Sequence, residues 1–152
     1  MTDQNPQSGD QGAVVARWDI THNAARRLVD DVIAGAHAAQ AAVTVAVVDN
    51  SGVLVAFDRL DGAPRFSAQI AIAKAQTAAT FGNATSSMEE LFRDRPVFAN
   101  SFAHLGGWYF GRGGFPIVVD GAVVGGIGVS GERAEREEEL AGRAARSLSP
   151  SE

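Results

Sequence analysis

The sequence predicts an α+β domain in which helices flank a mainly antiparallel five-stranded sheet. Two tight hairpins support this, because strands joined by a few turn residues pair antiparallel. Segments with helical patterns lie before, between and after the hairpins, and each must cover a face of the sheet. The expected order is helix, hairpin, helix, short helix, hairpin, helix, without an internal repeat.

Composition indicates one globular domain. The 152 residues are 45% hydrophobic and 20% charged, which is ordinary for a protein with a sizeable core. Residues 1–16 are expected to be a disordered tail, since the first twelve are polar and lack periodicity. Residues 17–149 are expected to form the domain, and Val14–Trp18 fits either a short strand or an extended lead-in.

Charge and residue usage exclude several classes of function. A net charge of −5 without a basic face argues against nucleic acid as a partner. The absence of cysteine rules out disulfides, thiolate metal sites and a cysteine nucleophile. No apolar run approaches the roughly 20 residues of a membrane span, so we expect no membrane partner. Without a signal-like N-terminus, a cytoplasmic protein is expected.

The first helix is expected from Thr21, a suitable N-cap, to about Gln40. Its apolar residues recur with helical spacing and form one face. They are Ala25, Leu28, Val29, Val32, Ile33 and Ala36. The first hairpin follows, with strands Val43–Val48 and Val53–Phe57 joined by turn residues 49–52.

The middle helix is predicted over Phe66–Phe81 and is ended by Gly82. Its expected buried stripe consists of Phe66, Ile70, Ala73, Thr77 and Phe81. A shorter helix is expected from Ser86, where Ser86 and Glu89 fit a capping box, to about Arg93. Another helical turn is expected around Val97–Ala103, after Pro96.

The last hairpin joins Phe115–Val119 to Ala122–Val129 through Asp120-Gly121, a dipeptide favoured in type I′ turns. A charged helix over Glu132–Leu148 ends the domain. The carboxylates Glu137, Glu138 and Glu139 are interpreted as its solvated face. A Gly-x-Gly-x-x-Gly spacing inside this hairpin lacks the strand–helix context of a dinucleotide site, so we attribute it to close backbone packing.

The loop before the last hairpin carries the chain's unusual chemistry. It holds aromatic, basic and titratable groups among glycines, a pattern typical of a small-molecule pocket wall, although loop aromatics also cover cores. We expect it to fold over the middle helix. The residues concerned are His104, Trp108, Tyr109, Phe110 and Arg112.

Lys74 is the chain's one lysine, and its helical neighbours Ser67, Ala71 and Ala78 are small. Such a lysine could hold an anion or, when desolvated, act as a base or Schiff-base amine. The alternative is a snorkelling side chain with its ammonium in water.

His22 or His104 could be an axial haem ligand or a general base. The three histidines lack i, i+4 pairing, so no bound metal ion is predicted.

Three ordered motifs resemble the GlcG/HbpS family of haem-binding and haem-degrading-type domains, which includes the C-terminal domain of PduO-type proteins. They are AVVDNSGVLVAFDRLDGAP, AIAKAQTAATFG and GGFPIVVDGAVVGGIGVSG. The resemblance covers about Ile20–Leu148. It implies a profilin-like arrangement, homo-oligomers and haem as a possible cofactor. It also places Arg59 and Lys74 as ligand-pocket residues. The segment SFAHLGGWYFGRGG is more aromatic and polar than in many members.

Three functions remain open, and the sequence does not decide whether the protein is an enzyme. The first is a small-molecule-binding homo-oligomer, tetramer to octamer, with haem as the leading ligand. His104 or His22 would bind iron, and Arg59, Arg112 or Lys74 would pair with propionates. The remaining expected ligand-binding residues are Trp108, Phe110, Gly113 and Gly114.

The second function is a cofactor-free enzyme for a small aromatic or carbonyl-containing metabolite. Lys74 would bind or polarise an oxyanion, and His104 or Tyr109 would move a proton. A structural or sensory oligomer, with aromatics such as Trp108 at subunit contacts, is a third possibility.

Overall fold

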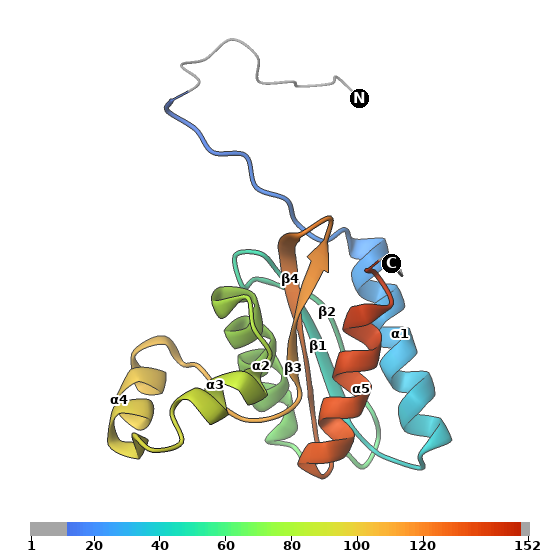
Figure 1. The fold of residues 1–152 in the computed structure, drawn as a ribbon. Coiled ribbons are helices and arrows are strands. Elements are labelled where there is room, and N and C mark those ends of the chain that lie inside the picture. The colour runs from blue at the N-terminus through green and yellow to red at the C-terminus, as the bar shows by residue number, and fades with distance from the viewer. Residues whose placement is uncertain (1–11, 150–152) are drawn as a thin grey trace.

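A computed structural model describes residues 12–149 of the chain, so residues 1–11 of the predicted tail lie outside it. Within this range the helices and the two hairpins follow one another in the predicted order (Figure 1). The elements are α1 (His22–Ala38), β1 (Thr44–Asp49), β2 (Leu54–Arg59), α2 (Ser67–Phe81), α3 (Thr85–Leu91), α4 (Pro96–Gly106), β3 (Gly114–Val119), β4 (Ala122–Ser130) and α5 (Ala134–Arg146).

The sheet of the described residues has four antiparallel strands in the order β2-β1-β4-β3. The prediction of five strands is therefore wrong. The segment before α1 joins the sheet through one bond, from the Ile20 N–H to the Val124 carbonyl at 2.9 Å. Thr21 then caps α1 at once, while Val14–Trp18 leads away from the sheet (Figure 1). In the part of the chain that the structure describes, Val14–Trp18 therefore belongs to no strand of the sheet.

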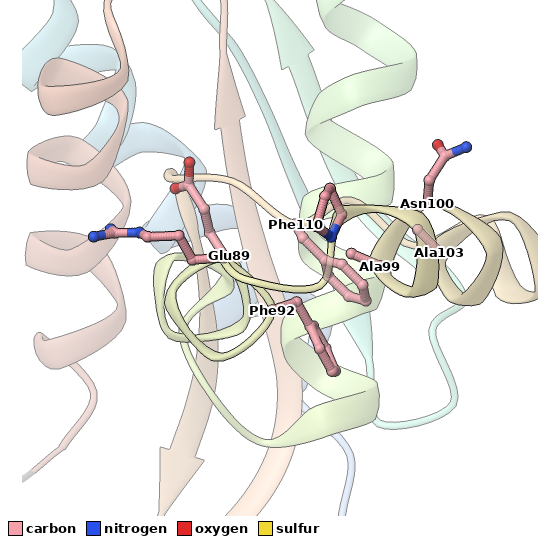
Figure 2. A pocket seen from close by; sticks show the side chains of 8 residues that line it. Glu89, Phe92, Ala99, Asn100, Ala103 and Phe110 are labelled. Carbon is pink, nitrogen blue, oxygen red and sulfur yellow. The ribbon is translucent and has the colours of Figure 1, made fainter.

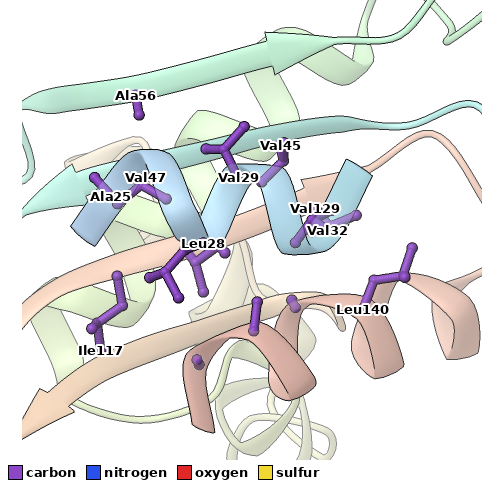
Figure 3. Close-up of a cluster of buried hydrophobic side chains, with 14 of the residues drawn as sticks. Ala25, Leu28, Val29, Val32, Val45, Val47, Ala56, Ile117, Val129 and Leu140 are labelled. Carbon is purple, nitrogen blue, oxygen red and sulfur yellow. The ribbon is translucent and has the colours of Figure 1, made fainter. Parts of the chain in front are cut away.

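The main core lies between the sheet and the helices α1 and α5, which cover the same face (Figures 1 and 3). The central strands are in register there, with Val45 opposite Val129 and Val47 opposite Ile127. Leu28 and Val32 of α1 pack on them. Helix α2 covers the other face, so β1 is buried on both sides.

Several local predictions are confirmed. The Thr21 hydroxyl accepts a hydrogen bond from the Ala24 N–H at 3.2 Å, as an N-cap should. Gly82 ends α2 in the left-handed conformation at φ 65°. Asp120 and Gly121 both have positive φ, 49° and 77°, which is the type I′ requirement.

The predicted buried stripe of α2 is wrong at its larger residues. Phe66 is 63% exposed and Ile70 is only half-buried. The helix instead buries a face of small residues around Lys74. They are Ser67, Ala71, Ala75, Ala78 and Ala79, together with Thr77.

Two glycines of β4 explain why α2 buries its small residues and not its large ones. A Cβ at Gly126 would lie 2.1 Å from the Ala75 carbonyl oxygen, and one at Gly128 would lie 2.1 Å from that of Ala71. The backbone of α2 therefore rests directly on the strand, as the predicted close packing of these glycines requires. No large side chain fits between them.

The segment from α3 to α4 also differs from prediction. Helix α3 begins at Thr85 with Ala84 at the N-cap, so the capping box at Ser86 is wrong. The Ser86 hydroxyl instead donates to Glu138 on α5. Helix α4 is longer than predicted, has no buried residue, and projects beside α2 away from the sheet (Figure 1).

We expect Gly128→Ala to lower the free energy of unfolding by about 3 kcal/mol or more, since neither backbone can move aside. Urea denaturation monitored by circular dichroism would measure it. The comparison variant is Gly35→Ala in α1, whose Cβ would meet one side-chain methyl, Leu140 Cδ2 at 2.8 Å, and no backbone atom of another element. Equal stability of the two variants would contradict the packing argument.

Candidate functional site

Lys74 is buried between α2 and the rest of the domain, with 1% of its surface exposed. Its Nζ donates to the Val129 carbonyl at 2.9 Å and to Glu137 Oε2 at 2.6 Å. The snorkelling alternative is therefore excluded. The ammonium is held between β4 and α5 by two hydrogen-bond acceptors.

Glu137 is the buried counterion that the sequence interpretation missed. It was assigned to a solvated face but is only 7% exposed. Its Oε1 accepts from the N–H groups of Gly131 at 2.8 Å and Glu132 at 3.2 Å. The signal was available in the lone lysine on an alanine-rich face, because a buried ammonium requires an anion.

Burial and neighbouring carboxylates shift the pKa values of Lys74 and Tyr109. Burial lowers the pKa of Lys74, and this is opposed by the hydrogen bond and charge of Glu137 and by the charge of Glu138. The ring of Tyr109 lies 5.3 Å from Lys74 Nζ. Burial raises the pKa of Tyr109, as do the charges of Glu137 and Glu89. The phenol is therefore protonated at neutral pH.

The loop before β3 folds over α2, as expected, and side chains hold its backbone. The Tyr109 N–H donates to Thr77 Oγ1 at 2.9 Å. The Gly113 N–H donates to Glu138 Oε2 at 2.7 Å, and the Gly114 N–H donates to Thr85 Oγ1 at 2.9 Å. Each anchor comes from a different helix: α2, α5 and α3.

Gly113 has to be glycine for this arrangement. Its φ is 102°, and a Cβ would lie 3.0 Å from Lys74 Nζ and 2.8 Å from the Val129 carbonyl oxygen. A Cβ at Gly114 would lie 2.8 Å from the Lys74 carbonyl oxygen. Both glycines therefore let the loop backbone approach the lysine closely.

An aromatic cluster connects α4 to the body of the domain. Trp108 packs edge-on against Phe81 of α2, with ring centroids 4.9 Å apart, and such pairs add stability beyond their buried area. Phe92 contacts Phe110 at 5.2 Å. The rings of the cluster are Phe81, Phe92, Phe98, Phe102, Trp108 and Phe110.

A groove of about 350 Å³ lies between α3, α4 and the loop (Figure 2). We call it the α3–α4 groove. Two aromatic rings, apolar α4 residues and a guanidinium line it. Its residues are Glu89, Phe92, Arg93, Pro96, Ala99, Asn100, Ala103 and Phe110. Arg93 and Glu89 also border an adjoining hollow that includes Arg112.

Two predicted site residues, His104 and Arg112, lie outside the lining of this groove. His104 is exposed in the last turn of α4, four residues after Asn100, so both lie along one side of the helix. Arg112 is exposed and lies 3.9 Å from Glu135 Oε1. Phe110 therefore lines the groove and Arg112 borders the adjoining hollow, whereas His104 lines neither of them.

Two other predicted site residues lie elsewhere. His22 opens α1 on the opposite face of the sheet from α2, and Arg59 ends the far edge strand β2. Neither lines the α3–α4 groove. A second groove of about 570 Å³ is lined by Thr21, Ala24 and Arg27 of the α1 region, but His22 is not part of its wall.

Two features are absent from residues 12–149. No group of three or more histidine or acidic residues is placed to hold a metal ion. In the same range no helix combines the length and apolar character of a membrane span.

Comparison with known proteins agrees with the resemblance drawn from the motifs. The family model described as haem degrading protein HbpS-like matches residues 20–146. Protein GlcG of Escherichia coli strain K12 is 36% identical over 91 residues, which make up 58% of this chain and 63% of GlcG. The chain thus spans less than two thirds of that relative's length.

Two solved structures share the fold. The crystal structure of HbpS gives a TM-score of 0.82 at 30% identity, over 93% of this chain and 97% of that one. The crystal structure of a PduOC–haem complex gives a TM-score of 0.78 at 26% identity, over 86% and 95% of the two chains. The α+β arrangement is therefore common to all three.

We expect Lys74→Met to lower the free energy of unfolding by about 3–5 kcal/mol, because it leaves the Glu137 carboxylate buried without its cation. Adding Glu137→Gln should restore part of the loss, since the amide oxygen can still accept from Gly131. Arg112→Ala, which breaks only an exposed pair, is the control and should cost less than about 1 kcal/mol. Chemical denaturation checks all three. A Lys74→Met variant as stable as the control would refute the argument.

Proposed function

We propose that this chain, which belongs to the family of HbpS-like proteins, binds haem in the α3–α4 groove. The solved PduOC structure is a complex with haem, and it matches 86% of this chain. The observation that carries the proposal is an aromatic groove with the Arg93 guanidinium in its wall and Arg112 in the adjoining hollow. The exposed imidazole of His104 lies on α4, the helix that forms one side of the groove.

The chemistry of the groove fits a porphyrin. Phe92 and Phe110 offer aromatic surface and lie 5.2 Å apart between ring centroids, while Ala99 and Ala103 line the α4 side without bulk. Apolar and aromatic walls with a few polar groups are typical of cofactor pockets. At about 350 Å³ the groove would cover part of the macrocycle and leave its edge exposed.

His104 is the candidate axial ligand. Its side chain is exposed and, among residues 12–149, makes no hydrogen bond or ion pair. A neutral imidazole is a common protein ligand of haem iron. Bound haem would supply the redox chemistry, and this chain would orient and shield it.

Arg93 and Arg112 would pair with the propionates. Arg93 now pairs with Glu90, and Arg112 lies near Glu135, in exposed contacts that contribute little to stability. Guanidinium groups bind carboxylates bidentately. Lys74 is unsuited to this role because its ammonium is buried against Glu137, and Arg59 lies at the far edge of the sheet.

The cofactor-free enzyme is not favoured. Lys74 Nζ already donates to two acceptors and is out of reach of solvent. Tyr109 holds its proton at neutral pH. His104 lies on the outer helix α4 and, within residues 12–149, makes no hydrogen bond or ion pair with either residue, so the three do not form one acid–base site.

Homo-oligomerisation is part of the proposal. Helix α4 exposes Val97 and Leu105, which are 81% and 82% accessible. Unusual exposure of large apolar side chains marks interaction surfaces. An assembly between tetramer and octamer would cover them and could also shield the open side of the groove.

Hemin titration followed by absorbance should give a Soret shift for the native protein. His104→Ala should weaken binding by about tenfold or more, equivalent to about 1.4 kcal/mol, and change the spectrum. His22→Ala is the matched histidine control and should behave like the native chain. No shift in the native protein would overturn haem binding. If hemin binding were lost only in His22→Ala, the iron ligand would be His22 at the start of α1 and not His104.

Light scattering after gel filtration should give a mass of four to eight subunits for the native protein. Leu105→Asp should shift it toward smaller species, because burying the new carboxylate in an interface is costly. Val53→Asp, at an exposed position on the first hairpin, is the control. A monomer at micromolar concentration would contradict the proposed assembly.

A further inference from the structure

One carboxylate of α5 joins two walls of the α3–α4 groove. Glu138 Oε1 accepts from the Ser86 hydroxyl of α3 at 2.6 Å, and its Oε2 accepts from the Gly113 N–H of the loop at 2.7 Å. Phe92 follows α3 and Phe110 lies three residues before Gly113, and both line the groove. Glu138 is itself absent from the groove lining.

We propose that Glu138 is a positioning residue that fixes the separation of the two groove walls and thereby the ligand affinity. The second half of this statement rests on the proposed haem function. The carboxylate spans the walls with one oxygen on each, so the loop and α3 are held at a single relative position.

The element that carries Glu138 is rigid. Helix α5 buries Leu140, Ala141 and Ala144 in the main core. Glu137, one residue earlier, is fixed by Lys74 and the Gly131 N–H. A side chain held by a well-packed helix can place weaker elements to within a fraction of an ångström.

The elements that Glu138 holds are weakly packed. Helix α3 buries only Thr85 and Met88, and α4 buries none of its residues. Apart from Glu138, the loop backbone is anchored to the Thr77 and Thr85 hydroxyls, and the Gly113 carbonyl accepts from the Val129 N–H of β4 at 2.8 Å. Segments with few buried contacts open locally at low free-energy cost, so the loss of one tether should change their motion measurably.

If Glu138 acts by positioning, what matters is its two hydrogen bonds and not its negative charge. Substitution by glutamine tests this, because it removes the charge and can keep both bonds. In Glu138→Gln the amide oxygen can accept from the Gly113 N–H, and the amide nitrogen can donate to the Ser86 oxygen. Glu138→Ala removes both bonds. The positioning role therefore predicts rescue by glutamine.

The experiment compares the native chain with Glu138→Ala and Glu138→Gln. Glu139→Ala, an exposed glutamate on the same helix, is the control. Hydrogen exchange read by mass spectrometry should become faster in residues 85–93 and 108–114 of Glu138→Ala and stay unchanged in β1. Hemin affinity should fall about tenfold in the same variant. Glu138→Gln and Glu139→Ala should match the native protein in both measurements.

The outcomes separate this inference from the haem proposal. Unchanged exchange in Glu138→Ala overturns the inference, and so does a Glu138→Gln variant that behaves like alanine. Faster exchange with unaltered hemin affinity also overturns it, because the walls would then move without effect on the ligand. A native protein that binds no hemin, together with faster exchange in Glu138→Ala, overturns haem binding and supports the tether.

Discussion

The buried ion pair between Lys74 and Glu137 is the interaction on which the rest of the structure depends. It joins α2 on one side of the sheet to α5 on the other, at the end of β4. A charge taken out of water is tolerated only when a partner and further hydrogen bonds satisfy it. Here the Val129 carbonyl serves the ammonium, and the N–H groups of Gly131 and Glu132 serve the carboxylate. The pair thus fixes both helices and the turn between β4 and α5.

The close contact between α2 and β4 makes this burial possible. Alanines on the helix meet glycines on the strand, so the two backbones approach without intervening side chains. Lys74 lies in this contact, and its ammonium reaches the Val129 carbonyl and Glu137 of α5. The loop backbone at Gly113 lies close to the Lys74 Nζ, because glycine has no Cβ there.

The proposed ligand groove lies on the less tightly packed part of the molecule. Helices α1, α2 and α5 bury their faces against the sheet, whereas α4 has no buried residue and packs through the aromatic cluster. Binding elements are commonly carried by such segments on a rigid scaffold. The Lys74–Glu137 pair and Glu138 form the border between the two parts, because they anchor the scaffold on one side and the loop on the other.

The sequence by itself determined the family, the α+β class and the local signals. The Thr21 cap, the Asp120-Gly121 turn and the end of α2 at Gly82 depend on neighbouring residues, so they could be predicted. Only the tertiary structure decided that Glu137 is buried, because its partner lies 63 positions away in the chain. It also decided which face of α2 is covered and that the sheet has four strands in the described range. Those features follow from contacts between distant segments, which periodicity along one segment cannot encode.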